Sequence, residues 1–475
     1  MPPDHLPPDE VTYDANSYVD PNGRVFEWRG QIYRAILPEA QSFFKELIAN
    51  PFFKELQEKG FIIPTHLTTF KLPTSNFILQ HEKVHFLSYC FEWCPQMLKD
   101  AALHTLELNS RLLEEGYTLQ DAYPFNIQYK NTRPEFIDIG SIINIPENTL
   151  WHPYQQFCNF FLLPLHLQNA GNFQAAKIFL MNYINGIQEE EFLNLIPLKY
   201  KLKHPDILVR FSLPVFLNNI FNRNKLYKPP GYKFISSINL QAVRMRFISS
   251  LIKAIKKIKL PETKSYWCDY YNYDFNDFTP SSSWNLKQKN VLNILQRLKP
   301  KTILDIGCNT GWYSMLAARQ GIQVVAFDSD PNCIAKLYLE AKTKNLSILP
   351  LVIDILNPTP SFGWKSTQFP SLQERMRNMD LVFFFAVLHH LVFKQRQNFD
   401  RILESIKAFN PKQVLIEFVS KEDEKSKILL TQTASDFSWY TQDNFEKSLE
   451  NHFRIINKVT SFPPTSCLYL CKSEI

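Results

Sequence analysis

The C-terminal part of the chain alternates between short apolar runs and segments with helical spacing. One apolar run, Thr302–Leu304, leads through a glycine-containing turn to a helix-spaced segment at Tyr313–Arg319, and a second run follows at Gln323–Phe327. Short apolar runs separated by helical spacing are typical of parallel strands joined by crossover helices. The pattern therefore predicts the first strand–helix–strand unit of a doubly wound parallel sheet.

The same alternation continues to the end of the chain. Further strands are predicted at 347–353, 379–385 and 413–419, with a closing antiparallel pair at 452–460 and 466–471. A helix-spaced segment at 286–298 precedes the first strand. We therefore predict an α/β fold here, built on a Rossmann-like seven-stranded sheet.

The first 260 residues show a mixed pattern. Helical spacing predicts one helix over Pro38–Lys59 and a longer one over Met97–Glu115, and residues 151–260 are mostly helical in pattern. Strand-like runs lie at 24–28, 31–36, 77–79 and 85–91, the first two forming a hairpin. These elements predict an α+β domain.

A chain of 475 residues exceeds what one hydrophobic core supports, so two or more domains are expected. The proline-rich start, the change of pattern near residue 260 and the dense aromatic residues after it suggest the boundaries. We predict a flexible tail at 1–22, an α+β domain at 23–260, an aromatic-rich linker or lid at 261–284 and an α/β domain at 285–475.

Composition and charge narrow the classes of partner. The net charge of +6 is small for this length and no lysine and arginine stripe stands out, so there is no nucleic-acid signal. No apolar run reaches the roughly 20 residues that span a bilayer, and no signal peptide is visible. The eight cysteines lack the paired spacing of a zinc site, which predicts buried free thiols and a cytoplasmic protein.

The turn after the first strand carries candidate chemistry. Gly307 and Gly311 are spaced G-x-x-x-G, unlike the G-x-G-x-x-G fingerprint that holds a pyrophosphate. The carboxylate of Asp305 would repel a pyrophosphate but suits a ligand with an ammonium group. Asp328, at the end of the second strand, is placed to accept hydrogen bonds from both ribose hydroxyls. The alternative is an ordinary turn with structural glycines, although the chain holds only 12 glycines.

The run Asp305-Ile-Gly307-Cys-Asn309-Thr-Gly311 resembles the first motif of the class I S-adenosylmethionine-dependent methyltransferases. The resemblance covers residues 284–475, and Asn309 stands where a middle glycine is usual. It implies that S-adenosylmethionine is the cofactor and that this loop binds it.

Later strand ends supply further candidate residues. The resemblance implies that Asp354 accepts from the adenine amine and that the N–H of Ile355 meets a ring nitrogen; the alternative for Asp354 is a helix N-cap. Ligands of open α/β sheets bind at strand carboxyl ends, so Phe385 is expected to face the methyl donor. One of the neighbours His389 and His390 is a candidate base or substrate hook, the alternative being a structural role.

A second constellation lies in the first domain. Asp121 and Asn126 have the spacing D-x-x-x-x-N, and Asp138-Ile-Gly140 follows. With the order of predicted elements, these residues resemble the protein-kinase-like fold, including its aminoglycoside-phosphotransferase branch. The resemblance implies Asp121 as a catalytic base, with Asn126 and Asp138 holding Mg²⁺ against the phosphates of ATP.

Three departures separate the domain from that pattern. The residues before Asp121 are not His-Arg, no glycine-rich loop precedes Arg34, and Arg34 itself stands where a strand lysine is expected. Glu39 and Glu46 are its candidate partners on the following helix. The alternative is a helical accessory domain with coincidental spacing.

The domain order, with the loops GYTLQDAYPFN and DIGCNTGWYS, resembles a bacterial family of methyltransferases with a kinase-like leader, some of whose members are linked to nodulation proteins. The resemblance implies a methyltransferase acting on a small-molecule or glycan acceptor. The alternatives are a phosphotransferase in the first domain and a non-enzymatic scaffold. Segment 261–284 either packs as a linker or covers the cofactor as a lid.

Overall fold

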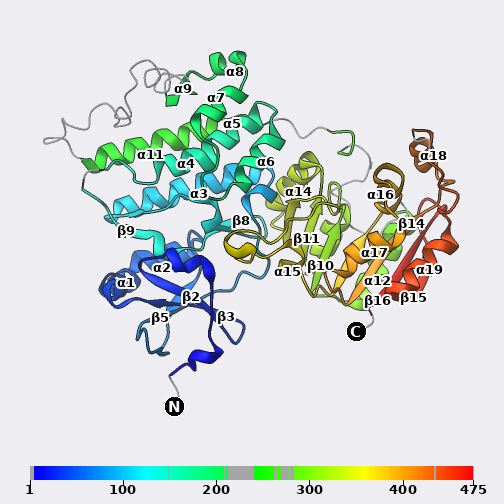
Figure 1. Cartoon of the computed structure of the whole chain (residues 1–475), viewed down its shortest axis with the longest axis horizontal. Helices are drawn as coiled ribbons and strands as arrows, with labels where there is room; N and C mark the ends of the chain where they lie inside the picture. Colours follow the sequence, from blue (N-terminus) through cyan, green and yellow to red (C-terminus); the bar gives the residue numbers. More distant parts are fainter. Residues whose placement is uncertain are drawn as a thin grey trace. The chain divides into compact units, whose positions relative to one another are not determined.

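The structure, a computed structural model, describes residues 5–147, 149–207, 210–211, 240–260, 265–268, 278, 283–432 and 435–473. The chain divides into two compact units (Figure 1). Unit 1 comprises residues 1–130 and 134–261, and unit 2 comprises residues 131–133 and 262–475. Each unit contains a sheet and a hydrophobic core of its own.

Unit 2 is built on a seven-stranded sheet with the order β12-β11-β10-β13-β14-β16-β15. β10 to β14 run parallel, whereas β16 is antiparallel to both β14 and β15. The strands are β10 (Thr302–Ile306), β11 (Gln323–Asp328), β12 (Ile348–Val352), β13 (Leu381–Phe384), β14 (Gln413–Val419), β15 (Phe453–Thr460) and β16 (Ser466–Ser473). The predicted α/β sheet, with its closing antiparallel pair, is confirmed.

Helices connect the parallel strands and bury one face of this sheet. They are α12 (Leu286–Leu298), α13 (Trp312–Arg319), α14 (Pro331–Thr343), α15 (Leu372–Arg375), α16 (Leu388–Gln395), α17 (Phe399–Lys407), α18 (Glu424–Thr431) and α19 (Gln442–His452), with a short turn, η9 (Trp364–Ser366). Alternate strand residues, among them Ile303, Val324 and Phe383, share one core with Val291 of α12 and Leu316 of α13. The strand period of two selects which side chains face these helices.

The strand order changes direction at β10. The chain proceeds from β10 to β11 and β12 on one side, and then returns to place β13 on the other side of β10. Ligands of open α/β sheets bind outside the carboxyl ends of the strands at such a point. The loops after β10, β11, β12 and β13 therefore frame the candidate site.

Unit 1 begins with a five-stranded antiparallel sheet in the order β1-β2-β3-β5-β4. Its strands are β1 (Thr12–Tyr13), β2 (Gly23–Trp28), β3 (Gln31–Ile36), β4 (Thr65–Leu67) and β5 (Ile78–His81). Two small pairs follow: β6 (Tyr117–Leu119) with β9 (Ile142–Asn144), and β7 (Ile127–Lys130) with β8 (Arg133–Phe136). Asp121 comes soon after β6 and Asp138 soon after β8, so the small pairs carry the second constellation.

The remaining part of unit 1 is helical, and α3 lies beside α11 (Figure 1). The helices are α1 (Gln41–Ala49), α2 (Pro51–Glu58), α3 (Pro95–Glu114), α4 (Tyr154–Phe157), α5 (Leu163–Asn169), α6 (Phe173–Met181), α7 (Glu189–Leu195), α8 (Leu198–Lys203), α9 (Pro205–Ile207) and α11 (Leu240–Lys257). Short helical turns are η1 (Pro8–Glu10), η2 (Ala15–Val19), η3 (Pro38–Ala40), η4 (Cys90–Glu92), η5 (Pro124–Asn126), η6 (Ile139–Ser141) and η7 (Cys158–Leu162). Unit 1 is thus the predicted α+β domain.

The structure differs from three predictions for unit 1. Residues 1–22 are predicted to be a flexible tail, yet β1 pairs with β2 and Leu6 is buried in the core of the first sheet. The helix predicted over 38–59 is divided, because Asn50 ends α1 and caps α2, which starts at a proline. The strand predicted over 85–91 is absent from the described residues, and η4 forms at its end through a capping box.

The structure describes residues 265–268, 278, 283 and 284 of the predicted linker or lid. Trp284 is buried in the core of unit 2. Phe278 stacks on Trp312 of α13 with ring centroids 5.2 Å apart. Within the described ranges, no helix is both long enough and apolar enough to cross a bilayer.

Candidate functional site

The loop between β10 and α13 adopts a backbone conformation that glycine and asparagine tolerate. Gly307, Asn309 and Gly311 have positive φ angles of 71°, 53° and 78°. Most other residues are strained in this region. The N–H of Gly307 donates to the carbonyl of Phe327 at 2.8 Å. The loop is therefore held against the end of β11, next to Asp328.

Asn309 connects three parts of the site. Its backbone N–H donates to Oδ2 of Asp328 at 2.9 Å, and its side-chain Nδ2 donates to the carbonyl of Trp267 at 2.9 Å. Its Oδ1 accepts from the N–H of Thr310 at 2.6 Å. A glycine, the usual residue of the motif, has no side chain to reach Trp267. The departure from the motif therefore fastens segment 265–268 to the loop.

The two loop glycines are also required by packing within the protein. A Cβ added at Gly307 would collide with the side chain of Val387, in the turn before α16. A Cβ added at Gly311 would collide with Leu337 of α14. The close approach of a ligand to Gly307 stays a prediction, but glycine is needed there even without one.

Three carboxylates lie at or just after the carboxyl ends of adjacent parallel strands. Asp305 is buried in β10 and accepts from the hydroxyl of Ser314 of α13 at 2.5 Å. Asp328 ends β11. Asp354 is exposed after β12, and its Oδ1 accepts from the N–H of Leu356 at 2.9 Å, so that it caps a turn and not a helix. This row suits a ligand that carries ammonium and hydroxyl donors and no phosphate, which fits S-adenosylmethionine.

Burial governs the charge on these acids. Burial raises the pKa of Asp305 to about 7, against the opposing effects of the Ser314 hydroxyl and the Lys287 ammonium. The pKa of Asp328 is also raised by burial, although the N–H groups of Asp330 and Asn309 oppose the rise. A cation beside either carboxylate favours its ionised form. Both acids are therefore suited to a cationic or hydroxyl-bearing ligand.

Two predicted positions lie at the same edge of the sheet. Ile355 is buried directly after Asp354. Phe385 is buried directly after β13, and its ring centroid lies 5.0 Å from that of Tyr313. The structure thus brings these residues to the carboxyl ends of the strands, and their contacts with a ligand stay a prediction.

A buried ion pair lies beside Phe385. Nζ of Lys287 in α12 donates to Oε2 of Glu417 in β14 at 2.7 Å, and the side chains are 3% and 2% exposed. The hydroxyl of Ser461 donates to the other carboxylate oxygen at 2.7 Å. The ammonium lies 4.9 Å from the ring centre of Tyr313 and 4.8 Å from that of Phe385. A buried ion pair therefore lies against two aromatic rings at this edge of the sheet.

The two candidate histidines lie side by side in α16. Their ring centroids are 4.1 Å apart, and the ring of Trp267 contacts His390 edge-on at 5.1 Å. Among the described residues, Nδ1 of each histidine has no hydrogen-bond partner. Burial lowers the pKa of His389 well below its ordinary value and that of His390 to about 4. Both rings are therefore neutral at pH 7, although pKa values lowered this far make them weak proton acceptors.

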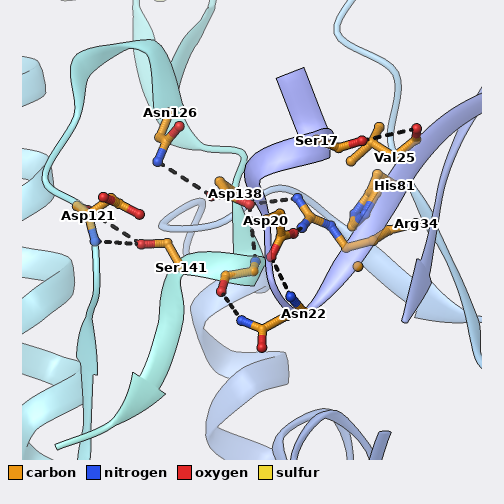
Figure 2. Close-up of polar contacts among 12 residues, drawn as sticks. Ser17, Asp20, Asn22, Val25, Arg34, His81, Asp121, Asn126, Asp138 and Ser141 are labelled. Atoms are coloured by element: carbon orange, nitrogen blue, oxygen red, sulfur yellow. Dashed lines mark hydrogen bonds and ion pairs between the residues drawn. The ribbon is translucent and has the colours of Figure 1, made fainter. Parts of the chain in front are cut away.

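In unit 1 the predicted residues gather around the loop after β8 (Figure 2). Nδ2 of Asn126 lies 3.5 Å from Oδ2 of Asp138. The N–H of Asp121 donates to the hydroxyl of Ser141 at 2.9 Å, and its Oδ1 accepts from Gln156 at 3.4 Å. Burial, and then the charge of Asp138, raise the pKa of Asp121.

Arg34 has other partners than those predicted. Its guanidinium donates to Oδ2 of Asp20 and, at 2.6 Å, to Oδ1 of Asp138. Glu39 and Glu46 are exposed. The prediction of Glu39 or Glu46 as the partner is therefore wrong, because β3 directs Arg34 to the loops around Asp20 and Asp138.

Sequence reasoning missed Asp20, Trp267 and Lys287 as site residues. The unusual arginine at position 34 is a signal that some acid must compensate it, but it does not say which one. The aromatic density of segment 261–284 is a signal for Trp267. The sequence feature that points to Lys287 is the unusual Glu417 within the apolar run of β14.

The class of unit 2 follows from this site and from its family match. Residues 285–452 match the family model described as a methyltransferase domain. Together with the mixed seven-stranded sheet, this match supports an S-adenosylmethionine-dependent methyltransferase domain. The chain is thus an enzyme of that class, as the sequence predicts.

Individual known proteins share different parts of the chain. It is 29% identical over 453 residues to the nodulation protein NoeA of Rhizobium meliloti (strain 1021), covering 94% of this chain and 92% of that protein. It is 26% identical over 158 residues to a glycine/sarcosine N-methyltransferase of Parasynechococcus marenigrum (strain WH8102), covering 30% of this chain and 56% of that protein.

Solved structures are more distant. The bifunctional kinase-methyltransferase WbdD is 18% identical, with a TM-score of 0.29, covering 47% of this chain and 45% of that chain. The chain thus spans less than half of that structure.

Proposed function

We propose that unit 2 transfers the methyl group of S-adenosylmethionine to a hydroxyl or amine of a small-molecule or glycan acceptor. The observation that carries the proposal is the row of Asp305, Asp328 and Asp354 beside the Gly307–Gly311 loop. Asp328 would hold the ribose hydroxyls, Asp305 the amino group, and Asp354 with Ile355 the adenine. The bound sulfonium supplies an activated methyl carbon.

The protein contributes to the reaction by aligning the two reactants and by removing a proton. Holding two reactants in line is a large share of the rate enhancement in such a displacement. A hydroxyl acceptor also has to lose a proton, and a neutral His389 or His390 takes it through an unpartnered ring nitrogen. Burial, the neighbouring imidazole of His390 and the ammonium of Lys287 all keep His389 neutral by lowering its pKa. An acceptor that binds as a free amine needs no base before transfer.

Segment 265–268 supports a lid role for the predicted linker. Trp267 contacts the methyl-donor loop through its carbonyl and His390 through its ring. A residue that touches both halves of a site is suited to exclude water from the space between them. We propose that this segment covers the site when both ligands are bound.

The acceptor class rests on chemistry and on one relative. Glycans and many small metabolites present hydroxyls, for which the histidine pair offers a base. The relative named as a glycine/sarcosine N-methyltransferase is named for small amines. The free state of all eight cysteines is in keeping with a cytoplasmic location.

A second candidate function is phosphotransfer from Mg-ATP in unit 1. It is favoured by the proximity of Asn126 to Asp138, with Asp121 held close by through Ser141. The other contacts of Asp138 oppose it, for reasons developed below.

A labelled-methyl assay tests the proposed function. The protein is incubated with methyl-labelled S-adenosylmethionine and a cell extract that is then separated into small-molecule, glycan, protein and nucleic-acid fractions. The proposal predicts label in the small-molecule or glycan fraction, and much less label there with Asp328→Ala. Label confined to protein or nucleic acid would contradict the acceptor class, and absent cofactor binding in calorimetry would contradict the function.

A further inference from the structure

Three charged residues of unit 1 converge from separate segments (Figure 2). Asp20 follows η2 in the connection between β1 and β2, Arg34 lies in β3, and Asp138 caps η6. In protein kinases, the corresponding places hold a loop that covers the phosphates, a lysine that pairs with them and an acid that binds Mg²⁺. A magnesium nucleotide would have to bind among these three residues.

Asp138 is surrounded by hydrogen-bond donors. Its Oδ1 accepts from Arg34 at 2.6 Å and from the N–H of Gly140 at 3.2 Å. Its Oδ2 faces the amide Nδ2 of Asn126 at 3.5 Å. Mg²⁺ requires oxygen ligands in near-octahedral array, so the asparagine would have to present its oxygen and the arginine would have to leave. The observed arrangement does not fit the metal.

The phosphate side of the site is filled by the protein itself. Residues 14–22 contain no glycine, and Asp20 brings a carboxylate to the Arg34 guanidinium. The N–H of Asn22 donates to Asp20 at 2.8 Å, and its side chain donates to the carbonyl of Gly140 at 3.0 Å. An anion at this point repels a phosphate and already uses the positive charge that would attract one. The observed arrangement does not fit the nucleotide either.

Gly140 provides an independent observation. A Cβ added there would lie 2.8 Å from Oδ2 of Asp20 and would collide with the guanidinium of Arg34. The glycine of the Asp138-Ile-Gly140 run is therefore explained by the space that the arginine fork needs. The three ionic side chains are 6%, 15% and 27% exposed for Arg34, Asp20 and Asp138, so the cluster is largely withdrawn from water.

We infer that Arg34 is a built-in cation that takes the place of magnesium in unit 1. The Asp20–Arg34–Asp138 cluster, here named the arginine clamp, fastens the first sheet to the 138–141 loop. Both carboxylates accept hydrogen bonds from one side chain of the same unit, and the connection that would cover phosphates is hydrogen-bonded to the loop through Asn22. Unit 1 in this state binds neither Mg²⁺ nor Mg-ATP.

Thermal unfolding of the full-length protein tests the clamp. The unmodified protein is melted with and without millimolar Mg²⁺, Mn²⁺ and Mg-ATP, and no shift in the melting temperature is expected. An upward shift with Mg-ATP that disappears in Asp138→Asn would overturn the inference, because it would mean that Asp138 is free to bind the metal.

A gain of metal binding is the sharper outcome. Arg34→Gln removes the cation and leaves Asp20 and Asp138 as two neighbouring carboxylates, which is a site for a divalent ion. Mg²⁺ or Mn²⁺ should raise the melting temperature of this variant by about 3 °C or more. The response should vanish in Arg34→Gln/Asp138→Asn. Arg29→Gln is the matched control, because Arg29 pairs with Glu10 at 3.8 Å on the exposed side of the same hairpin.

The Arg34 variants either support or overturn the inference, whether or not Arg34→Gln folds. A folded Arg34→Gln protein that ignores both metals would overturn the substitution of arginine for magnesium. If Arg34→Gln does not fold, Arg34→Lys and the unmodified protein decide: both retain a positive charge, neither should respond to Mg-ATP, and a response in either would overturn the inference.

Discussion

Carboxylates that are buried or partly buried have opposite surroundings in the two units. In unit 2, Asp305 and Asp328 accept from a hydroxyl and from backbone N–H groups. In unit 1, Asp20 and Asp138 share the guanidinium of Arg34. A carboxylate bonded only to neutral donors remains available to pair with a cationic ligand, whereas one paired with an internal cation does not. The spacing of acids along the sequence therefore indicates where a ligand site lies. Whether a cationic ligand can bind there depends on whether a cation of the protein already pairs with those acids.

Unit 2 also contains acidic and basic side chains that pair with each other, so the difference is one between individual sites and not between the two units. Lys287 and Glu417 are almost fully buried and satisfied by Ser461. This pair supplies fixed charge beside the aromatic rings of Tyr313 and Phe385. We expect it to shape the site without binding the methyl donor directly.

The largest effect on stability is expected from removing Arg34, the cation that pairs with Asp20 and Asp138. Arg34→Met leaves Asp20 and Asp138 uncompensated and partly buried, and should lower the free energy of unfolding of unit 1 by about 3–5 kcal/mol. Urea denaturation measures this change. Arg29→Met, at an exposed pair, should change stability by less than about 0.5 kcal/mol. Similar effects for both arginines would remove the distinction between the clamp and a surface pair.

Removing Asp328 from the candidate cofactor site should weaken ligand binding more than it lowers the stability of the fold. Asp328→Ala should weaken S-adenosylmethionine binding by about 1.5–3 kcal/mol, the scale of a lost charged hydrogen bond. Calorimetric titration measures the affinity, and Asp436→Ala, an exposed acid of unit 2, is the control. Unchanged affinity in Asp328→Ala would rule out the ribose assignment.

The Gly307 substitution tests the loop between these acids. Gly307→Ala should cost about 1–2 kcal/mol of stability for its positive φ angle, with a further loss from the collision with Val387. Adding Val387→Ala should recover the collision part and leave the backbone part. An alanine variant as stable as the parent would mean that the loop relaxes away from the observed conformation.

The smallest effect is a pH dependence set by Asp305. Because its pKa is raised to about 7, the carboxyl is largely protonated below that pH and cannot pair with the amino group of the cofactor. Affinity should rise by up to about tenfold in total between pH 5 and pH 7 and then level off. Asp305→Asn should flatten this profile, and a profile that the substitution leaves unchanged would exclude Asp305 as its source.

The same group affects stability with the opposite trend. Between the ordinary pKa of 3.8 and the folded value of about 7, the folded protein holds a proton that the unfolded chain has released. Stability contributed by Asp305 therefore falls as the pH rises through this window. Urea unfolding of the parent and of Asp305→Asn should diverge in this range.

Much of unit 2 is predictable because its strands are short, apolar and separated by helical spacing. The run from Thr302 to Phe327 contains strand, turn, helix and strand in local order, so periodicity alone locates Asp305 and Asp328. The partner of Asn309 is not predictable in this way. Its contact with the Trp267 carbonyl joins residues 42 positions apart, and no local pattern encodes that distance.

Unit 1 is less predictable for the same physical reason. Asn50-Pro51 divides a helix that apolar spacing joins, since spacing does not register the missing proline N–H. The partners of Arg34 lie 14 and 104 positions away, whereas Glu39 and Glu46 are the near neighbours that sequence favours. Charge pairing in a fold follows the sheet that brings residues together, not their separation along the chain.

Calorimetric titration of the full-length protein with each of two ligands tests the central claim most directly. S-adenosylmethionine should bind with one site per chain, and the heat should fall sharply in Asp328→Ala. Mg-ATP at millimolar concentration should give no binding heat. The account would be contradicted by the reverse pattern, in which Mg-ATP binds through Asp138 and S-adenosylmethionine does not bind at all.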